Sequence, residues 1–186
     1  RTNPAISFWD TKSVTERISE FPFIVSFCYI RDETNHMADV LLPERTDFES
    51  TQLIRVGGTK FSEAYWDHEG VALRQPAIEP LGDTMDFTDI ATALAERAGI
   101  LENYNNAINR GAAGVPLKGS NYDFSLNTVQ NHATESIWQA MCQAASAELT
   151  GGAESDGLDW YKEHGIRTKP ISRLIWYLFP EMRKKG

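Results

Sequence analysis

Two short apolar runs that each end in a polar segment constrain this chain more than any other feature of its sequence. The first run, residues 23–27, stops before the polar turn at residues 31–34, and the second, residues 40–42, ends at Pro43. Short continuous apolar runs bounded by turn residues are typical of buried parallel strands. Because open α/β sheets bind ligands outside the carboxyl ends of such strands, the polar turn is a candidate ligand site.

Length and charge restrict the classes of protein to which the chain can belong. Its 186 residues are enough for one domain with a real core and an appended subdomain. The net charge of −8 argues against nucleic acid as a partner, because phosphate binding requires clustered Lys and Arg side chains. The basic cluster at residues 183–185 is interpreted as a helix end or, alternatively, as a binding patch. No apolar run reaches the length of about 20 residues that a membrane-spanning helix requires.

The cysteines and histidines give no metal-binding pattern. Cys28 and Cys142 are far apart, and the absence of a CxxC spacing argues against a zinc knuckle, an iron–sulfur cluster or a thioredoxin-type site. The segment Asp67-His68-Glu69 contains three metal-ligating residue types, but adjacent residues of an extended segment point to opposite faces. Cys28 lies in a site-like position at a strand end, although a small buried hydrophobic residue is the alternative interpretation.

The order of apolar and polar residues predicts a mixed, helix-rich α/β fold. A short helix over residues 11–20, capped by Asp10 or Thr11, leads into the first strand and forms with it the back half of a βαβ unit. This strand pairs either with residues 40–42 and later segments or with a sheet that precedes the chain. We therefore expect residues 1–50 to be the end of a doubly wound α/β domain with few strands. Residues 51–186 are expected to form a mixed extended and helical region that packs with the first part.

Five helical segments are predicted after the extended residues 53–79. Capping residues and glycines mark the ends of these helices, which cover residues 86–98, 100–109, 128–149, 158–164 and 171–182. We expect Ile90 and Leu94 on the buried face of the first of them. In the longest helix, the buried side is predicted to contain Val129, Ile137, Met141 and Ala145. The glycine-rich residues 111–127 are expected to form a loop.

Residue types alone do not assemble a complete catalytic site. The chain has no GxSxG nucleophile motif, and Gly57-Gly58 has neither phosphate-loop spacing nor a following Lys-Ser/Thr pair. Glu63 and Asp67 could serve as an acid–base pair, but an acidic chain contains many such pairs by chance. Aromatic residues near the end of the chain predict either core packing or a surface that faces another domain: Trp160, Tyr161, Trp176, Tyr177 and Phe179.

The turn at residues 32–34 admits two interpretations. Its carboxylates and hydroxyl could bind a sugar or a guanine group. Alternatively, the turn caps a helix over residues 34–38, with Asp32 and Glu33 close to the positive helix end. Both can hold together, because a helix N-terminus that follows a strand is itself a natural ligand site.

An ordered set of short motifs extends from residue 3 to about residue 99. The main motifs are Asn3-Pro4, Asp32-Glu33-Thr34, Ala38-Asp39, Leu42-Pro43, Glu49 and Glu79-Pro80-Leu81-Gly82. In this order they resemble the middle of the catalytic subunits of the dimethyl-sulfoxide-reductase family of molybdenum or tungsten enzymes. Residues 157–165 also resemble the stretch before the family's final β-barrel domain, whereas residues 100–156 carry little of the resemblance.

The resemblance implies a large catalytic subunit in which two molybdopterin guanine dinucleotides hold one molybdenum or tungsten ion, usually with an iron–sulfur cluster. This sequence lacks the family's cluster cysteines, its metal-ligating residue and its last cofactor-clasping domain. We therefore interpret the chain as an internal fragment, with no cofactor expected in it alone and no activity expected alone. The implied partners are the remaining domains of its own subunit and an iron–sulfur electron-transfer subunit, in either the periplasm or the cytoplasm.

Carried onto this sequence, the resemblance implies a contact with the guanine end of one cofactor through Cys28, Asp32 and Thr34. The Asp-Glu-Thr form favours the thiosulfate, polysulfide, arsenate and aromatic-substrate branches over formate dehydrogenase. The alternative function is a free-standing, acidic α/β binding or interaction module without catalysis.

Overall fold

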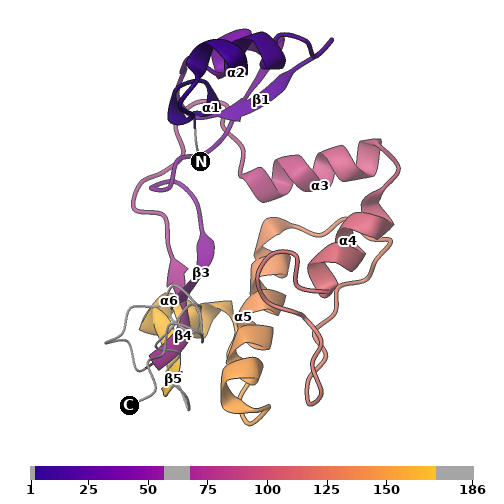
Figure 1. Ribbon diagram of the computed structural model, residues 1–186. Helices are drawn as coiled ribbons and strands as arrows, with labels where there is room; N and C mark the ends of the chain where they lie inside the picture. Colours follow the sequence, from indigo (N-terminus) through magenta and orange to yellow (C-terminus); the bar gives the residue numbers. More distant parts are fainter. Residues whose placement is uncertain (1–2, 57–67, 171–186) are drawn as a thin grey trace, which may run out of the picture. The chain divides into compact units, whose positions relative to one another are not determined.

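The computed structural model of the protein describes residues 3–56 and 68–170 (Figure 1). These residues form a mixed α/β fold, which confirms the fold class expected from the sequence. The elements follow one another as α1 (Pro4–Ser7), α2 (Thr11–Ile18), β1 (Val25–Cys28), the 3₁₀ turn η1 (Asn35–Met37), β2 (Val40–Pro43), β3 (Gln52–Val56), β4 (His68–Arg74), α3 (Phe87–Arg97), α4 (Leu101–Asn109), α5 (Thr134–Thr150), α6 (Leu158–His164) and β5 (Ile166–Pro170). Among the described helices, none combines the length and the hydrophobicity that crossing a membrane requires.

Several features singled out in the sequence lie outside the described residues. They are Gly57-Gly58, Glu63, Asp67, the predicted helix over residues 171–182 with Trp176, Tyr177 and Phe179, and the basic cluster at residues 183–185.

The described residues divide into two compact units. The first unit comprises the described residues up to Ser50 together with Pro76–Phe87, and the second comprises those of Thr51–Gln75 and of Thr88 onwards. The chain therefore returns to the first unit after its excursion through β3 and β4. The assignment of residues 1–50 and 51–186 to two domains that pack together stays a prediction.

The first unit is built on a parallel pair of strands, β1 and β2. Their register runs from Val25 opposite Val40 to Cys28 opposite Pro43, so the two carboxyl ends lie at the same edge. The sequence allowed two alternative pairings for the strand β1, and in the structure β1 pairs with β2 of the same chain. Before β1 lies α2, whose N-terminus is capped as expected, because Asp10 Oδ1 accepts a hydrogen bond of 3.1 Å from the Ser13 amide.

The segment after β2 is bound to residues 76–87 by backbone hydrogen bonds. The Met85 amide donates to the Pro43 carbonyl at 3.2 Å, and the Arg45 amide donates to the Met85 carbonyl at 3.1 Å. This pattern extends the parallel pairing by one isolated bridge between Glu44 and Met85. The Phe87 ring packs edge-on against Phe27 of β1, with 5.6 Å between ring centroids.

The interior of the first unit is polar. Among its described residues, Ala5 is the one buried hydrophobic side chain, whereas five polar or charged residues are buried: Asn35, Glu44, Glu49, Ser50 and Asp86. Large hydrophobic side chains are instead exposed, including Phe8, Trp9, Phe21 and Phe23. Parallel sheets normally have both faces covered, so this unit presents more apolar surface than such a sheet usually does.

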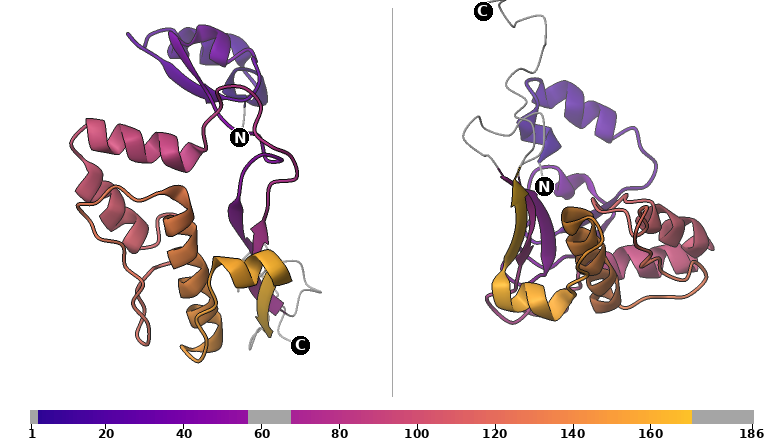
Figure 2. Two further views of the ribbon diagram at one scale, coloured as in Figure 1. Left: turned by 180° about the vertical axis from the view of Figure 1, so that it is seen from behind. Right: turned by 90° about the horizontal axis from the view of Figure 1, so that it is seen from below.

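The second unit combines the antiparallel sheet β3-β4-β5 with four helices. Helix α5 lies along one face of this sheet and contacts β3 and β5 (Figures 1 and 2). Strand β5 was not predicted, because residues 166–170 follow a helix without a turn cluster and form a strand only by pairing with β4. The pairing is close, since a Cβ on Gly70 would stand 2.3 Å from the Arg167 carbonyl oxygen.

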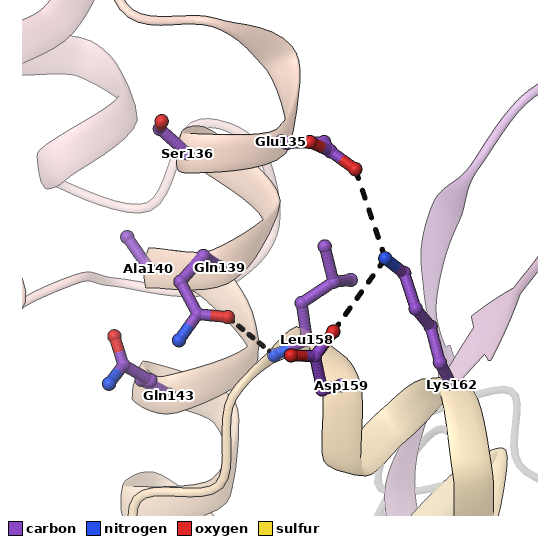
Figure 3. A pocket seen from close by; sticks show the side chains of 8 residues that line it. All are labelled: Glu135, Ser136, Gln139, Ala140, Gln143, Leu158, Asp159 and Lys162. Carbon is purple, nitrogen blue, oxygen red and sulfur yellow. Dashed lines mark hydrogen bonds and ion pairs between the residues drawn. The ribbon is translucent and has the colours of Figure 1, made fainter.

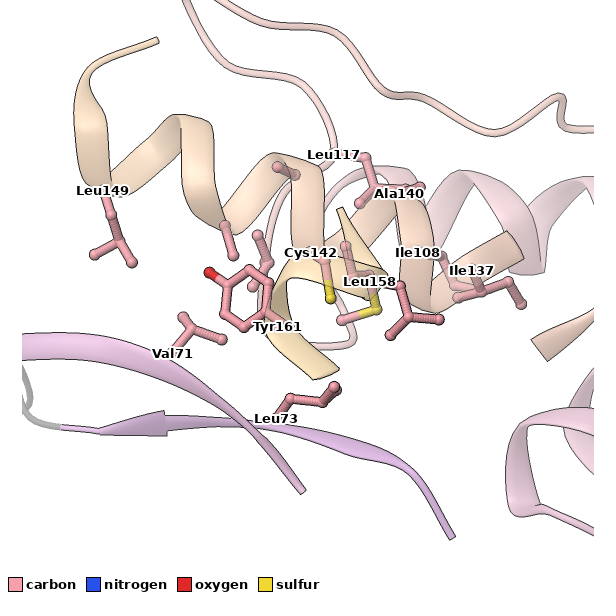
Figure 4. Packing of buried hydrophobic residues seen from close by; sticks show 14 residues of the cluster. Val71, Leu73, Ile108, Leu117, Ile137, Ala140, Cys142, Leu149, Leu158 and Tyr161 are labelled. Carbon is pink, nitrogen blue, oxygen red and sulfur yellow. The ribbon is translucent and has the colours of Figure 1, made fainter. Parts of the chain in front are cut away.

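The hydrophobic core belongs to the second unit (Figure 4). Helix α5 contributes Ile137, Met141 and Ala145, as its periodicity predicts. Tyr161 of α6 is completely buried against this helix, which confirms core packing for that aromatic residue. Trp160 packs at the edge of the cluster and is only partly buried.

Two predicted core positions are wrong. Leu94 of α3 is 45% exposed, and Val129 is 66% exposed because α5 begins at Thr134 rather than at residue 128. The residues before α5 are held outside the helix by Asn105, which is fully buried. Its Nδ2 donates to the carbonyls of Thr128 and Gln130 at 2.9 and 2.8 Å.

The Asn105 contacts lead to a stability prediction. The variant Asn105→Asp replaces an amide donor that faces backbone carbonyls with a carboxylate, which both removes the hydrogen bonds and repels the oxygens. We expect it to lower the free energy of unfolding by about 1–3 kcal/mol. Urea unfolding followed by circular dichroism measures this difference.

The matched control is Asn103→Asp on the exposed side of the same helix. Its effect should remain within about 0.5 kcal/mol. Equal unfolding midpoints for the two variants would contradict the role given to Asn105.

Candidate functional site

The first candidate site lies at the carboxyl end of β1, where Cys28 and the turn at residues 32–34 follow one another. Cys28 is half-buried and is a free thiol. Its carbonyl accepts a hydrogen bond of 3.0 Å from the Glu44 amide, which continues the parallel ladder past β2. The chain then leaves the sheet and reaches Asp32, which is also half-buried.

Asp32 is held by a reciprocal pair of hydrogen bonds with Asn35. The Asn35 amide donates to Asp32 Oδ1 at 2.9 Å, and the Asp32 amide donates to Asn35 Oδ1 at 3.0 Å. Asn35 is itself buried, and its Nδ2 donates to the Ile30 carbonyl at 2.8 Å. The orientation of the Asp32 carboxylate is therefore fixed by a neighbour that cannot move freely.

Thr34 occupies the position before η1, but its hydroxyl does not cap that turn. The hydroxyl donates to Asn3 Oδ1 at 2.5 Å and accepts from the Ala5 amide at 2.9 Å. The helix expected over residues 34–38 is a single 3₁₀ turn of three residues, Asn35–Met37. Thr34 thus connects the turn to α1.

Glu33 is the third member of the turn, and Asn3 Nδ2 donates to its Oε2 at 2.6 Å. The pKa of this carboxyl lies below its usual value, first because its own backbone amide donates to it and then because of the Asn3 hydrogen bond. An electrostatic interaction with His36 adds a smaller lowering of the pKa of Glu33. Glu33 is therefore a carboxylate at neutral pH.

Glu49, one of the residues that carry the sequence resemblance, links two segments of the first unit by hydrogen bonds. Its Oε2 accepts hydrogen bonds from the amide and the hydroxyl of Thr46 at 2.8 and 2.7 Å, and its Oε1 accepts from the Leu81 amide at 2.9 Å. These hydrogen bonds, the one from the Thr46 amide first, hold its pKa below the usual value of 4.5. Glu49 thereby fastens the Glu-Pro-Leu-Gly segment to the loop after β2.

A second candidate lies in the second unit, where α5 and α6 border an open hollow of about 400 Å³. Its lining side chains are shown in Figure 3: Glu135, Ser136, Gln139, Ala140, Gln143, Leu158, Asp159 and Lys162. The Lys162 ammonium lies 3.8 Å from Glu135 and 3.7 Å from Asp159, so its charge is compensated locally. Gln139 Oε1 accepts a hydrogen bond of 2.7 Å from the Leu158 amide, so this oxygen is bound to the backbone at the start of α6.

Metal ligands do not converge in the described part of the chain. Within residues 3–56 and 68–170, no three His, Cys, Asp or Glu side chains lie close enough together to hold a metal ion. His164 instead stacks on Trp160 with 4.3 Å between centroids, and the Arg167 guanidinium lies 4.4 Å from the centre of the same ring. Arg167 also pairs with Glu154 and Asp156, which makes this cluster a structural fastening of β5.

Cys142 has the environment of a core residue. It is fully buried in α5, and burial raises the pKa of its thiol to about 12. A thiolate at this position is therefore scarce at neutral pH, and Cys142 is unsuited to nucleophilic chemistry.

The turn could be located from the sequence, but the two residues that hold it, Asn35 and Asn3, were not predicted. Asn35 follows the turn directly, and an Asp-x-x-Asn spacing is a recognisable signal for the reciprocal hydrogen bonds with Asp32. The contact from Asn3 had no such signal, because Thr34 lies 31 positions further along the sequence.

The chain shows a limited similarity to a known protein. No family model matches the chain. Over 102 residues it is 31% identical to a protein described as probable oxidoreductase YoaE of Bacillus subtilis (strain 168). The aligned region covers 54% of this chain and 14% of that relative, so the chain spans a small part of the relative's length.

The Glu49 contacts predict a pH-dependent contribution to stability. Because the pKa of the folded state is lowered, the carboxylate stabilises the fold above the ordinary value of 4.5, and this contribution is lost as the pH falls through the lowered value. We expect Glu49→Gln to unfold at lower urea concentration than the natural sequence at about pH 7, with the difference narrowing at about pH 3.

The matched control for this experiment is Glu79→Gln, which changes an exposed carboxylate in the segment that Glu49 contacts. It should leave the midpoint nearly unchanged at both pH values. A Glu49→Gln difference that is independent of pH would contradict the assignment.

The two thiols are predicted to react at different rates. With a thiol reagent at about pH 8, the half-buried Cys28 should be modified in the folded protein, whereas Cys142 should react only after denaturation. Cys28→Ser and Cys142→Ser identify which thiol is counted. Modification of Cys142 in the folded protein at the rate of Cys28 would contradict the buried environment described above.

Proposed function

We propose that this chain is part of the large subunit of a molybdopterin-guanine-dinucleotide-dependent oxidoreductase, and that the turn after β1 contacts the guanine end of one cofactor. The observation that carries the proposal is the fixed Asp32 carboxylate at the shared carboxyl edge of β1 and β2. This edge is where open α/β sheets bind nucleotide ligands. The similarity to a probable oxidoreductase supports the coarser part of the proposal, a redox function.

The residues present fit the guanine group. A carboxylate accepts hydrogen bonds from both the ring N–H and the amino group of guanine, and Asp32 is held in one orientation by Asn35. The half-buried Cys28 offers a small side chain at the strand end, beside which a planar base can lie. The Thr34 hydroxyl has its proton committed to Asn3, so we assign it a supporting part in the contact.

The cofactor, when bound, supplies two-electron oxidation or oxygen-atom transfer at its metal ion. The contribution of the described residues is to bind and orient the guanine end. The apolar surface of the first unit supports a setting among further domains, because Phe8, Trp9 and Phe23 are exposed. The activity of the whole subunit, its substrate and an iron–sulfur partner subunit are proposals that follow from the sequence resemblance.

The test is the composition of the native protein as its own cell produces it. We expect molybdenum or tungsten by elemental mass spectrometry and GMP after acid hydrolysis of the bound cofactor. In that protein, Asp32→Ala should lower the GMP content by about tenfold, because the guanine loses a charge-assisted pair of hydrogen bonds.

The matched control is Asp83→Ala, which removes an exposed carboxylate of the same unit. Its GMP content should equal that of the natural sequence. A native product of 20.9 kDa without metal or guanine would overturn the proposal and favour the acidic binding module instead.

A further inference from the structure

Both polar groups of the Asn3 side chain form hydrogen bonds with the turn after β1. Its Oδ1 accepts the Thr34 hydroxyl at 2.5 Å, and its Nδ2 donates to Glu33 Oε2 at 2.6 Å. Its backbone carbonyl accepts the Ser7 amide at 2.9 Å and so begins α1. Asn3 thus joins the first helix to two successive residues of a turn that is distant in sequence.

Pro4 contributes to this connection because its backbone nitrogen carries no hydrogen. Proline has no amide hydrogen, so the first backbone donor after Asn3 is Ala5, and this amide donates to the Thr34 hydroxyl at 2.9 Å. Ala5 is buried, with 2% of its surface exposed. The Thr34 oxygen therefore has its donor and one acceptor position filled by the Asn3–Ala5 segment.

The hydrogen bonds from Asn3 and Ala5 matter because the other hydrogen bonds of the turn join residues that are close in sequence. Asp32 is bound to Asn35, and Asn35 is bound to Ile30, so these hydrogen bonds close the turn on itself. Within the described residues, the hydrogen bonds from Asn3 and Ala5 are those that fix residues 32–34 to a segment distant in sequence. A three-residue 3₁₀ turn has little stability of its own.

We propose that Asn3 is a positioning residue for guanine recognition, because it holds the turn so that the Asp32 carboxylate keeps its orientation at the end of β1. This inference rests on the proposed function of the turn and adds a residue that lies 29 positions before Asp32 in the sequence. Asn3 itself contacts Thr34 and Glu33 and acts on the ligand only through them.

The test measures base preference in the cofactor-free, full-length protein that contains this chain. GMP and AMP are titrated separately by calorimetry, since adenine lacks the two donors that a carboxylate accepts from guanine. The natural sequence should bind GMP more tightly than AMP. Asn3→Ala should weaken GMP binding by about tenfold and leave AMP binding unchanged, so the preference falls by the same factor.

Thr34 variants identify the hydrogen bond that matters. Thr34→Val removes the hydroxyl at nearly constant shape and should lower the GMP preference, whereas Thr34→Ser keeps the hydroxyl and should retain it. Thr34→Val should add little to Asn3→Ala in the double variant, because both remove the same contact. Asn103→Ala, an exposed asparagine of α4, is the control and should leave the preference unchanged.

The outcomes separate this inference from the function on which it rests. If the natural sequence shows no preference for GMP, the proposed function of the turn fails and the positioning role fails with it. If the natural sequence prefers GMP and Asn3→Ala keeps that preference, only the positioning role is overturned. Equal loss of GMP and AMP binding in Asn3→Ala, with a lower melting temperature, would make Asn3 merely structural and would also overturn it.

Discussion

Parallel pairing of β1 and β2 is the constraint on which the arrangement of the first unit depends. Parallel strands cannot be joined by a tight hairpin, so the chain must leave at the carboxyl edge of β1 and travel back before β2 begins. Here the return path contains only the 3₁₀ turn η1, which is too short to cover the sheet as a crossover helix would. The polar turn after Cys28 and the loop after Pro43 therefore emerge at the same edge, and both are fixed by hydrogen bonds.

The two units are stabilised by different interactions. In the second unit, α5 and the sheet enclose a contiguous cluster of hydrophobic side chains around Tyr161 and Met141. Burial of this apolar surface, at about 25 cal/mol per Å², contributes most of the stabilisation there. In the first unit the buried side chains are mostly polar, and each satisfied hydrogen bond contributes only about 0.5–1.5 kcal/mol net. Because few hydrophobic groups are buried there, the loss of the Glu49 hydrogen bonds affects a larger share of the unit's stability.

Local signals explain which parts of the fold were predictable from the sequence. Helices α2, α4 and α6 begin and end close to the predicted residues because capping groups and glycines act within one turn. Strand β5 and the late start of α5 were missed, since the first requires β4 and the second requires the buried Asn105. In both cases a contact between distant segments overrides the local preference.

The candidate site divides in the same way. Cys28 and the turn at residues 32–34 could be located from the end of an apolar run, whereas the contact between Asn3 and Thr34 depends on two segments that only the fold brings together. Asn-Pro and Glu-Thr look like separate motifs in the sequence, but in the structure they form one hydrogen-bonded connection. Such a connection preserves the shape of the edge at which we propose a cofactor contact. A resemblance carried by these residues therefore concerns the architecture of this edge. Under the proposed function, the chemistry of the reaction must be specified by other residues.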